Sequence, residues 1–273
     1  MLELKHLHKN LMERTTDYRD NNPNLEKIRL IRMTFTHLVR AEQFPNRIHW
    51  QYRDTFAVCI IPLILLNGYF LEQIFGHSAN VAIGDTVFRG ILFIIACTLY
   101  KTMLVEHWQK YKQAIWRSSL LVIVGAVMLQ MIISLTRSFL PTGVAVESSD
   151  QLDPDQITFI SLIFISLGPL FTALLEDIIF RYTLLQKLFV KPWLWRVVLV
   201  LMNSVLFGLI HYHNFDGNLV ATVSFMVAGL FLNLIYLWTR NIWHVLLIHF
   251  VNNAVLSLGA VIVLEILKGL NAA

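Results

Sequence analysis

The sequence has little charge and almost no cysteine. Only 15% of its 273 residues are charged, whereas 56% are hydrophobic, and the mean hydropathy is +0.59. This composition is too apolar for an ordinary soluble domain of the same length. Both cysteines, Cys59 and Cys97, fall in apolar stretches, where a free cysteine behaves as a small hydrophobe. We therefore expect two unpaired thiols.

Long apolar runs take the place of charge. They have roughly the length that an α-helix needs to cross the hydrocarbon core of a bilayer. They can be drawn at 55–75, 90–105, 118–140, 157–185, 195–212, 219–238 and 242–267. The sequence therefore predicts an all-α fold, a polytopic transmembrane helix bundle with about seven spans, within a range of six to eight.

The N-terminal part lacks the pattern of a signal peptide. Residues 1–53 are polar and the first apolar run is long enough to span, so we expect the first span to target and anchor the chain. This basic arm carries ten Lys and Arg, the loops at 106–117 and 187–196 are also basic, and 147–155 is acidic. Under the positive-inside rule, this alternation predicts a cytoplasmic N-terminus.

The basic arm contains apolar residues at helical spacing, namely Ile28, Ile31, Phe35 and Leu38. The pattern favours an amphipathic helix, which either lies in the membrane interface or docks as a solvated helix on the cytoplasmic side of the bundle. Attraction to anionic lipid accounts for the basic charge. We therefore expect the lipid bilayer as a partner and no nucleic acid.

Polar residues are scarce in the late apolar helices, and those present form three short patterns. These are Glu176-Asp177-x-x-x-Arg181, Phe207-x-x-x-His211 and His249-x-x-x-Asn253. An ionisable residue in a membrane segment is costly, which favours a functional site over a role in stability. Together they supply a base, a group that positions water and a donor for an oxyanion. This combination indicates hydrolysis.

The first pattern separates two carboxylates. Asp177 and Arg181 are four residues apart, so they share a helical face and can form an ion pair. Glu176 is rotated about 100° from Asp177 around the helix and points elsewhere, which leaves it available as a general base. Gly168 and Pro169 are expected to break the helix upstream. The alternative is a solvated cluster at the cytoplasmic edge of the membrane.

The second pattern contains two candidate histidines. His211 follows Phe207 by one helical turn, whereas His213 lies on the other side of the helix. Only one of them can face a shared site, and the spacing from Phe207 favours His211. A structural or interfacial histidine is the simpler alternative.

The third pattern extends into a polar stripe. His249, Asn253 and Ser257 recur at every fourth position of the last span, and such a stripe faces partner helices or a wet cavity. Hydrogen bonds that hold helices together are the alternative interpretation.

The three motifs together resemble those of the CPBP (CAAX prenyl protease and bacteriocin-processing, or ABI) family of intramembrane proteases. The family pattern is Glu-Glu-x-x-x-Arg, Phe-x-x-x-His and His-x-x-x-Asn, and the likeness covers roughly residues 157–256. The resemblance implies that Glu176 and His211 hold and activate the attacking water. It also implies that His249 and Asn253 stabilise the oxyanion, and it suggests a bacterial cell membrane.

Two positions complete the comparison with the family pattern. Arg181 matches the family arginine. Asp177 replaces the more usual second glutamate, and its shorter side chain argues against a direct catalytic role. On this basis we predict three parts, which are the basic cytoplasmic arm (1–53), anchoring transmembrane helices (54–156) and a CPBP-like catalytic core (157–273).

The family is often described as metallopeptidases, but a zinc motif is missing from this chain. The sequence lacks His-Glu-x-x-His, which places two ligands and a base on one helical face, and Asn is a poor zinc ligand. We therefore favour a glutamate-activated water without a tightly bound metal or other cofactor. Zinc held by Glu176, His211 and His249 is the alternative.

Three functional hypotheses follow. The leading one is an intramembrane endopeptidase, a hydrolase that cleaves a peptide or a lipidated protein near or within the bilayer. The second is a non-catalytic membrane scaffold or bacteriocin-immunity factor of the same fold. The third is a proton or metal transporter, since buried Glu and His suit relays. No internal repeat is visible, which removes support for the paired halves of secondary transporters.

Overall fold

The computed structural model describes residues 39–76, 78–140, 157–215 and 217–271, and within these ranges every regular element is a helix. The amphipathic segment predicted at Ile28 to Leu38 and the acidic stretch 147–155 lie outside the described residues. The elements are α3 (Tyr52–Phe75), α4 (Ala79–Leu99), α5 (Lys101–Gln113), α6 (Ile115–Ser138), α7 (Phe159–Ile165), α8 (Leu167–Asp177), η2 (Ile178–Gln186), α9 (Trp193–Leu209), η3 (Tyr212–Phe215), α10 (Val223–Thr239) and α11 (Ile242–Asn271).

Five of these helical stretches are long and apolar enough to cross a membrane. They are Tyr52–Phe75, Ala79–Leu99, Ile115–Ser138, Phe159–Gln186 and Ile242–Leu270, and the shorter apolar helices α9 and α10 accompany them. Large apolar side chains such as Trp116, Phe139 and Ile160 are exposed on the outside of the bundle, as expected of a surface that faces lipid. The predicted all-α polytopic bundle is confirmed, and the protein is an integral membrane protein.

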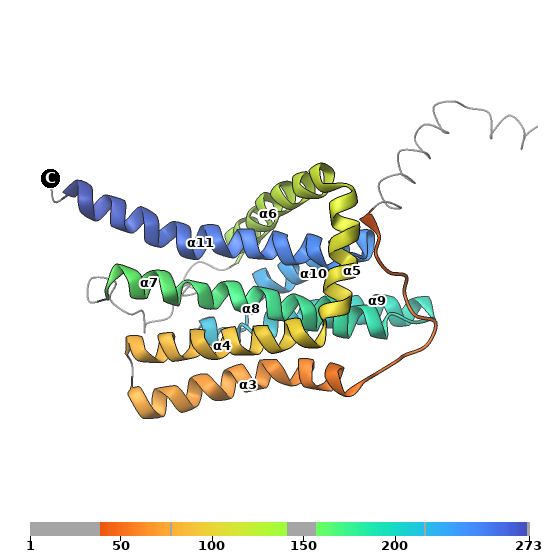
Figure 1. Ribbon diagram of the computed structural model, residues 1–273, viewed down its shortest axis with the longest axis horizontal. Coiled ribbons are helices and arrows are strands. Elements are labelled where there is room, and N and C mark those ends of the chain that lie inside the picture. Colours follow the sequence, from red (N-terminus) through yellow and green to blue (C-terminus); the bar gives the residue numbers. More distant parts are fainter. Residues whose placement is uncertain (1–38, 77, 141–156, 216, 272–273) are drawn as a thin grey trace, which may run out of the picture.

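The predicted bounds of the second span, 90–105, were wrong. The span runs over Ala79–Leu99. The span contains the charged residues Asp85 and Arg89, which are four residues apart and form an ion pair, with 2.6 Å between Arg89 Nε and Asp85 Oδ2. The pairing lowers the cost of keeping both charges inside an apolar helix. The stretch after Leu99 forms the separate helix α5, which lies across one end of the bundle (Figure 1).

Helix α8 occupies the middle of the bundle. It contacts α4 on one side and α11 on the other, while α3 packs on α4 and α6 packs on α11 (Figure 1). Gly168 allows the approach of α8 to α4, because a Cβ at this position would lie 2.9 Å from Thr86 Oγ1. Residues on α8 therefore reach several neighbouring helices.

The break in the fourth span lies slightly before its predicted position. α7 ends at Ile165 and α8 begins at Leu167, so Ser166 marks the break, and Gly168 and Pro169 belong to the first turn of α8. Proline is tolerated there because the first N–H groups of a helix have no intrahelical acceptor. The same span ends in the π-helix η2, which begins directly after Asp177.

Buried polar contacts fasten the end of the bundle that carries α5. Asn241 Nδ2 donates to the carbonyl oxygens of Val39 and His107, at 3.1 and 2.8 Å, and so connects the chain before α3 to α5 and α11. The fully buried carboxylate of Asp54, at the start of α3, accepts a hydrogen bond from Lys187 after η2. These contacts fix the ends of helices that carry the polar motifs.

Gly208 in the last turn of α9 provides a test of this packing. A Cβ there would lie 2.3 Å from Met226 Cγ, 2.8 Å from Met226 N and 2.9 Å from Thr222 O, so the backbone of α10 must move. We expect Gly208→Ala to lower the free energy of unfolding by about 1–3 kcal/mol. Denaturant unfolding in detergent micelles measures the change.

Gly68→Ala is the matched control, because nothing lies within 4 Å of a Cβ at position 68 of α3. Alanine at an interior helix position should leave stability unchanged or raise it by up to about 1 kcal/mol. Equal stability of the two variants would contradict the close packing of α9 on α10.

Candidate active site

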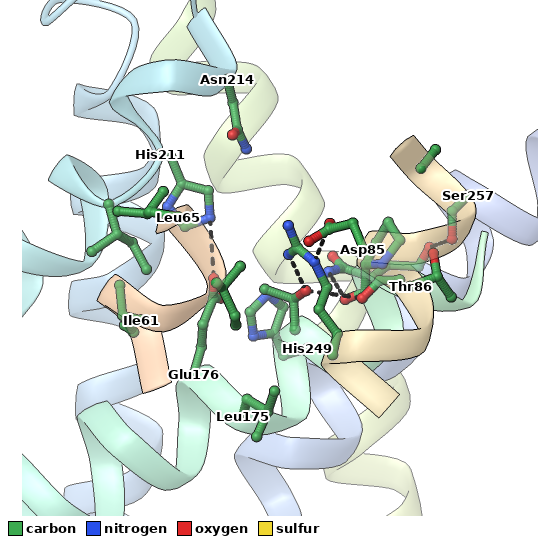
Figure 2. Close-up of a pocket in the computed structure, with 18 of the residues that line it drawn as sticks. Ile61, Leu65, Asp85, Thr86, Leu175, Glu176, His211, Asn214, His249 and Ser257 are labelled. Carbon is green, nitrogen blue, oxygen red and sulfur yellow. Dashed lines mark hydrogen bonds and ion pairs between the residues drawn. The ribbon is translucent and has the colours of Figure 1, made fainter. Parts of the chain in front are cut away.

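A cavity of about 520 Å³ opens among the membrane helices. Its walls come from α3, α4, the α7–α8 stretch, α11 and the segment that follows α9, and they include Glu176, His211, His249, Asn253 and Ser257. Figure 2 shows Glu176 and His211 facing each other, with His249 beside them. Four residues of the sequence motifs, far apart in the chain, therefore share one cavity.

Glu176 lies in the last turn of α8 and is 6% exposed. Its Oε1 is 3.8 Å from Nε2 of His211. This distance exceeds that of a direct hydrogen bond, so both atoms can receive hydrogen bonds from the same small molecule.

His211 lies just beyond the end of α9, and the helix end orients its ring. Nδ1 is 2.8 Å from the carbonyl oxygen of Phe207. Because a carbonyl oxygen can only accept, Nδ1 carries the proton, and Nε2 of the neutral ring is left as an acceptor toward Glu176. The ring also stacks on Phe225, with centroids 4.3 Å apart. His213 is exposed and does not line the cavity, so the choice of His211 over His213 agrees with the geometry.

The stripe on α11 serves two purposes. Asn253 Nδ2 donates to the carbonyl of Pro169 at 3.2 Å, and Ser257 Oγ lies 3.2 Å from the carbonyl of Ser166, so these residues tie α11 to the α7–α8 junction. Both still line the cavity. His249 is different, because its Nδ1 faces Oδ2 of Asp177 at 3.4 Å and its ring borders the cavity.

Asp177 and Arg181 lie behind the wall of the cavity. Neither has any exposed surface, and neither lines the cavity. Arg181 Nη1 is 3.1 Å from Asp177 Oδ1, the ion pair that the spacing indicated. Asp177 therefore lies between Arg181 and His249, and its contacts are those of a residue that orients His249.

Phe207 packs against three polar side chains of the motifs. The Arg181 guanidinium lies 4.2 Å from its ring centroid, and the rings of His211 and His249 lie at 5.2 and 5.9 Å. Gly229 of α10 permits this arrangement, since a Cβ there would lie 2.8 Å from Cδ1 of Phe207. The carbonyl of Gly229 also accepts a hydrogen bond from Arg181 Nη2 at 3.4 Å.

The π-helix η2 was not expected from the sequence. It starts one residue after Asp177, and widened turns of this kind are rare and frequent at functional sites. The side chain of Asn203 on α9 donates to the carbonyl of Phe180 within it, at 3.0 Å. No residue type in Ile178–Gln186 distinguishes a π-helix from an α-helix, so the sequence carries no signal for it.

Five polar residues of the cavity were not predicted from the sequence, namely Asp85, Thr86, Arg89, Thr172 and Asn214. Arg89 Nη1 donates to Thr172 Oγ1, and Asn67 Nδ2 donates to Asp85 Oδ1 at 3.2 Å. The signal was present, since Asp85 and Arg89 are oppositely charged and four residues apart within an apolar stretch.

The alternative zinc site can be compared with the geometry. Among the described residues, no group of three or more His, Cys, Asp or Glu side chains has an arrangement that could hold a metal ion. His249 turns Nδ1 toward Asp177, while Glu176 faces His211. The residues proposed as zinc ligands therefore face different partners, Glu176 toward His211 and His249 toward Asp177.

Part of the chain matches the model of a known protein family. Residues 158–255 match the family described as type II CAAX prenyl endopeptidase Rce1-like. The chain is therefore similar to this family over residues 158–255, which we call the Rce1-like segment. The match confirms the family resemblance of the three motifs. The Rce1-like segment contains α7, α8, η2, α9, α10 and the first part of α11, so it holds all six candidate residues. It supports a fold of the CAAX-protease-type intramembrane endopeptidases. Comparisons with curated proteins and with solved structures yield no match to this chain.

Substitutions of Asp177 and Arg181 test whether these two residues stabilise each other behind the wall of the cavity. Asp177→Asn leaves a buried guanidinium without its carboxylate, so we expect the free energy of unfolding to fall by about 3–5 kcal/mol. Combining it with Arg181→Gln should cost less than the sum of the two single changes, because the double variant buries no unpaired charge. Denaturant unfolding in detergent measures all three variants.

Glu106→Gln is the control for removal of a carboxylate, because Glu106 is exposed on α5. We expect its effect to stay within about 0.5 kcal/mol. Strict additivity of the Asp177 and Arg181 substitutions would show that the two side chains do not stabilise each other.

Proposed function

We propose that this protein is an intramembrane endopeptidase that hydrolyses a peptide bond in a lipidated or membrane-associated protein or peptide. The observation that carries the proposal is the Glu176–His211 pair, which faces a cavity enclosed by membrane helices. The Rce1-like segment contains both residues, and the description of its family supplies prenylated peptides as the first substrates to test.

The attacking water is bound between Glu176 and His211. Nε2 of the neutral His211 accepts one hydrogen bond from it, and the carboxylate of Glu176 accepts the other. Glu176 takes the proton as the water oxygen attacks the carbonyl carbon, and it returns this proton to the leaving nitrogen when the carbon–nitrogen bond breaks. General base catalysis by a positioned group contributes about 10²–10⁴-fold to the rate.

The oxyanion that forms on the substrate receives hydrogen bonds from α11. Nδ1 of His249 is directed at Asp177, and Nε2, the other ring nitrogen, is the atom that donates to the oxyanion in this proposal. One N–H of the Asn253 amide is used by the carbonyl of Pro169, and the second is available to the substrate. Loss of one such donor costs about 10²–10³ in rate in enzymes of known mechanism.

Conservative variants of Glu176 and His211 test this mechanism. We expect Glu176→Gln and His211→Gln each to reduce the cleavage rate by at least about 100-fold, because each removes a group that holds or deprotonates the water. The rate is measured with a fluorogenic farnesylated peptide and purified protein in proteoliposomes. Denaturant unfolding verifies that both variants are folded.

His213→Gln and Glu265→Gln are the matched controls, since both residues are exposed and lie outside the cavity. Their cleavage rates should stay within about twofold of the wild-type rate. If Glu176→Gln cuts as fast as the wild type, Glu176 is not the base. If it also restores the phenotype of a cell that lacks the protein, the scaffold hypothesis gains support.

Chelators test whether cleavage depends on a bound metal ion. Because Glu176 faces His211 whereas His249 faces Asp177, we expect 1,10-phenanthroline and EDTA to leave the cleavage rate within about twofold of the untreated rate. Loss of activity on chelation, followed by recovery with added Zn²⁺, would instead favour the zinc alternative.

A further inference from the structure

A second set of polar residues, which belongs to none of the three motifs, lines the same cavity. Arg89 and Asp85 on α4 and Thr172 on α8 all line the cavity. In the view of Figure 2, His249 lies between Glu176 on one side and Asp85 on the other. The mechanism above uses none of these three residues. An arginine that borders a cavity inside a membrane bundle is costly to keep and is by default a candidate for a functional role.

The contacts of Arg89 fix its guanidinium and leave one side of it open. Nε donates to Asp85 Oδ2 at 2.6 Å, and Nη1 donates to Thr172 Oγ1. Thr172 Oγ1 in turn donates to the carbonyl of Gly168 at 2.9 Å, so it acts as an acceptor for Arg89. Nη2 makes no hydrogen bond to any described residue, and 24% of the Arg89 side chain is exposed. The group is therefore oriented and still able to donate to a ligand.

The distance from Arg89 to the Glu176–His211 pair can be estimated from helix geometry. Thr172 and Glu176 are four residues apart on α8, so they share a face and are separated by about 6 Å along the helix axis. Arg89 reaches α8 at Thr172. An extended peptide advances about 3.3 Å per residue, so a group two or three residues from the scissile bond can reach Arg89.

We propose that Arg89 is a specificity-determining residue whose guanidinium binds a carboxylate of the substrate, two or three residues from the bond that is cleaved. Guanidinium groups match the planar geometry of carboxylates, and hydrogen bonds between charged groups are about twice as strong as neutral ones. Asp85 acts as a positioning residue that holds Nε. The inference rests on the proposed endopeptidase function, because it places the carboxylate relative to the scissile bond.

Binding to a variant that cannot cleave tests the inference separately from catalysis. The probe is a fluorescent peptide that ends in farnesyl-Cys-Val-Ile-Met, made as the free acid and as the C-terminal amide. With the Glu176→Gln variant in nanodiscs, we expect the acid to bind at least about 10-fold more tightly than the amide. Adding Arg89→Met should reduce this ratio to about one, mainly by weakening the binding of the acid.

Two matched variants separate the local charge from the overall charge. Arg117→Met removes an arginine that is exposed at the start of α6, outside the cavity, and should leave the ratio unchanged. Arg89→Lys keeps the charge without the planar guanidinium and should give an intermediate ratio. In the protein with Glu176 intact, Arg89→Met should raise KM for the acid peptide about 10-fold and leave KM for the amide unchanged. A merely structural role would affect both peptides alike.

A third peptide identifies the source of the carboxylate. It is a C-terminal amide with Glu in place of Met, and tight binding that depends on Arg89 would assign the subsite to acidic side chains as well as to the free C-terminus. Equal affinity for the acid, the amide and the Glu peptide would overturn the inference, even if Arg89→Met does not fold. A preference for the acid that survives Arg89→Met would also overturn it. If the wild type cleaves no peptide while Glu176→Gln still prefers the acid, the proposed function fails and the carboxylate subsite stands.

Discussion

The arrangement of the motifs depends on the burial of one charged pair inside a membrane bundle. Asp177 and Arg181 have no exposed surface, and a charge in such a place is stable only with its partner nearby. Their ion pair determines what must surround it. The guanidinium requires an aromatic face and a carbonyl, which Phe207 and Gly229 provide. The carboxylate requires a second cation or donor, and His249 faces it. Residues of all three motifs therefore contact the buried ion pair of Asp177 and Arg181.

The buried pair also explains why two adjacent acidic residues have different surroundings. On a helix, neighbouring side chains diverge by about 100°, so Glu176 borders the cavity while Asp177 points into the packed interior. The short side chain of Asp177 suits this second position, because it meets Arg181 and His249 without reaching the cavity. Phe207 connects the two sides, since it packs on the guanidinium and on both imidazole rings. Phe207 therefore contacts both the buried pair and the two imidazoles that border the cavity.

The sequence predicts those features that depend on local spacing. The ion pair of Asp177 and Arg181, the orientation of His211 relative to His213 and the apolar helices follow from helical periodicity and hydropathy. Prediction from the sequence fails for features that depend on a tertiary contact. The second span was predicted at 90–105 but runs over Ala79–Leu99, where the ion pair of Asp85 and Arg89 lowers the cost of two charges inside an apolar helix. The π-helix after Asp177 has no local signature, and the bond from Asn203 to Phe180 is visible only after folding. The roles of the six motif residues stay predictions until the variants are measured.

The walls of the cavity differ in chemistry, and this difference bears on how a membrane substrate could be held. Ile61, Ile64 and Leu65 from α3 form an apolar side, whereas α4, α8, α11 and the segment after α9 contribute the polar groups. An attached lipid chain gains free energy by lying against apolar side chains, but a peptide bond entering the same space must replace the hydrogen bonds that it loses from water. Donors on α11 can replace them, and the guanidinium on α4 can bind an anionic group farther along the substrate. A substrate that is apolar on one side of its scissile bond and anionic on the other therefore fits both kinds of wall in one orientation.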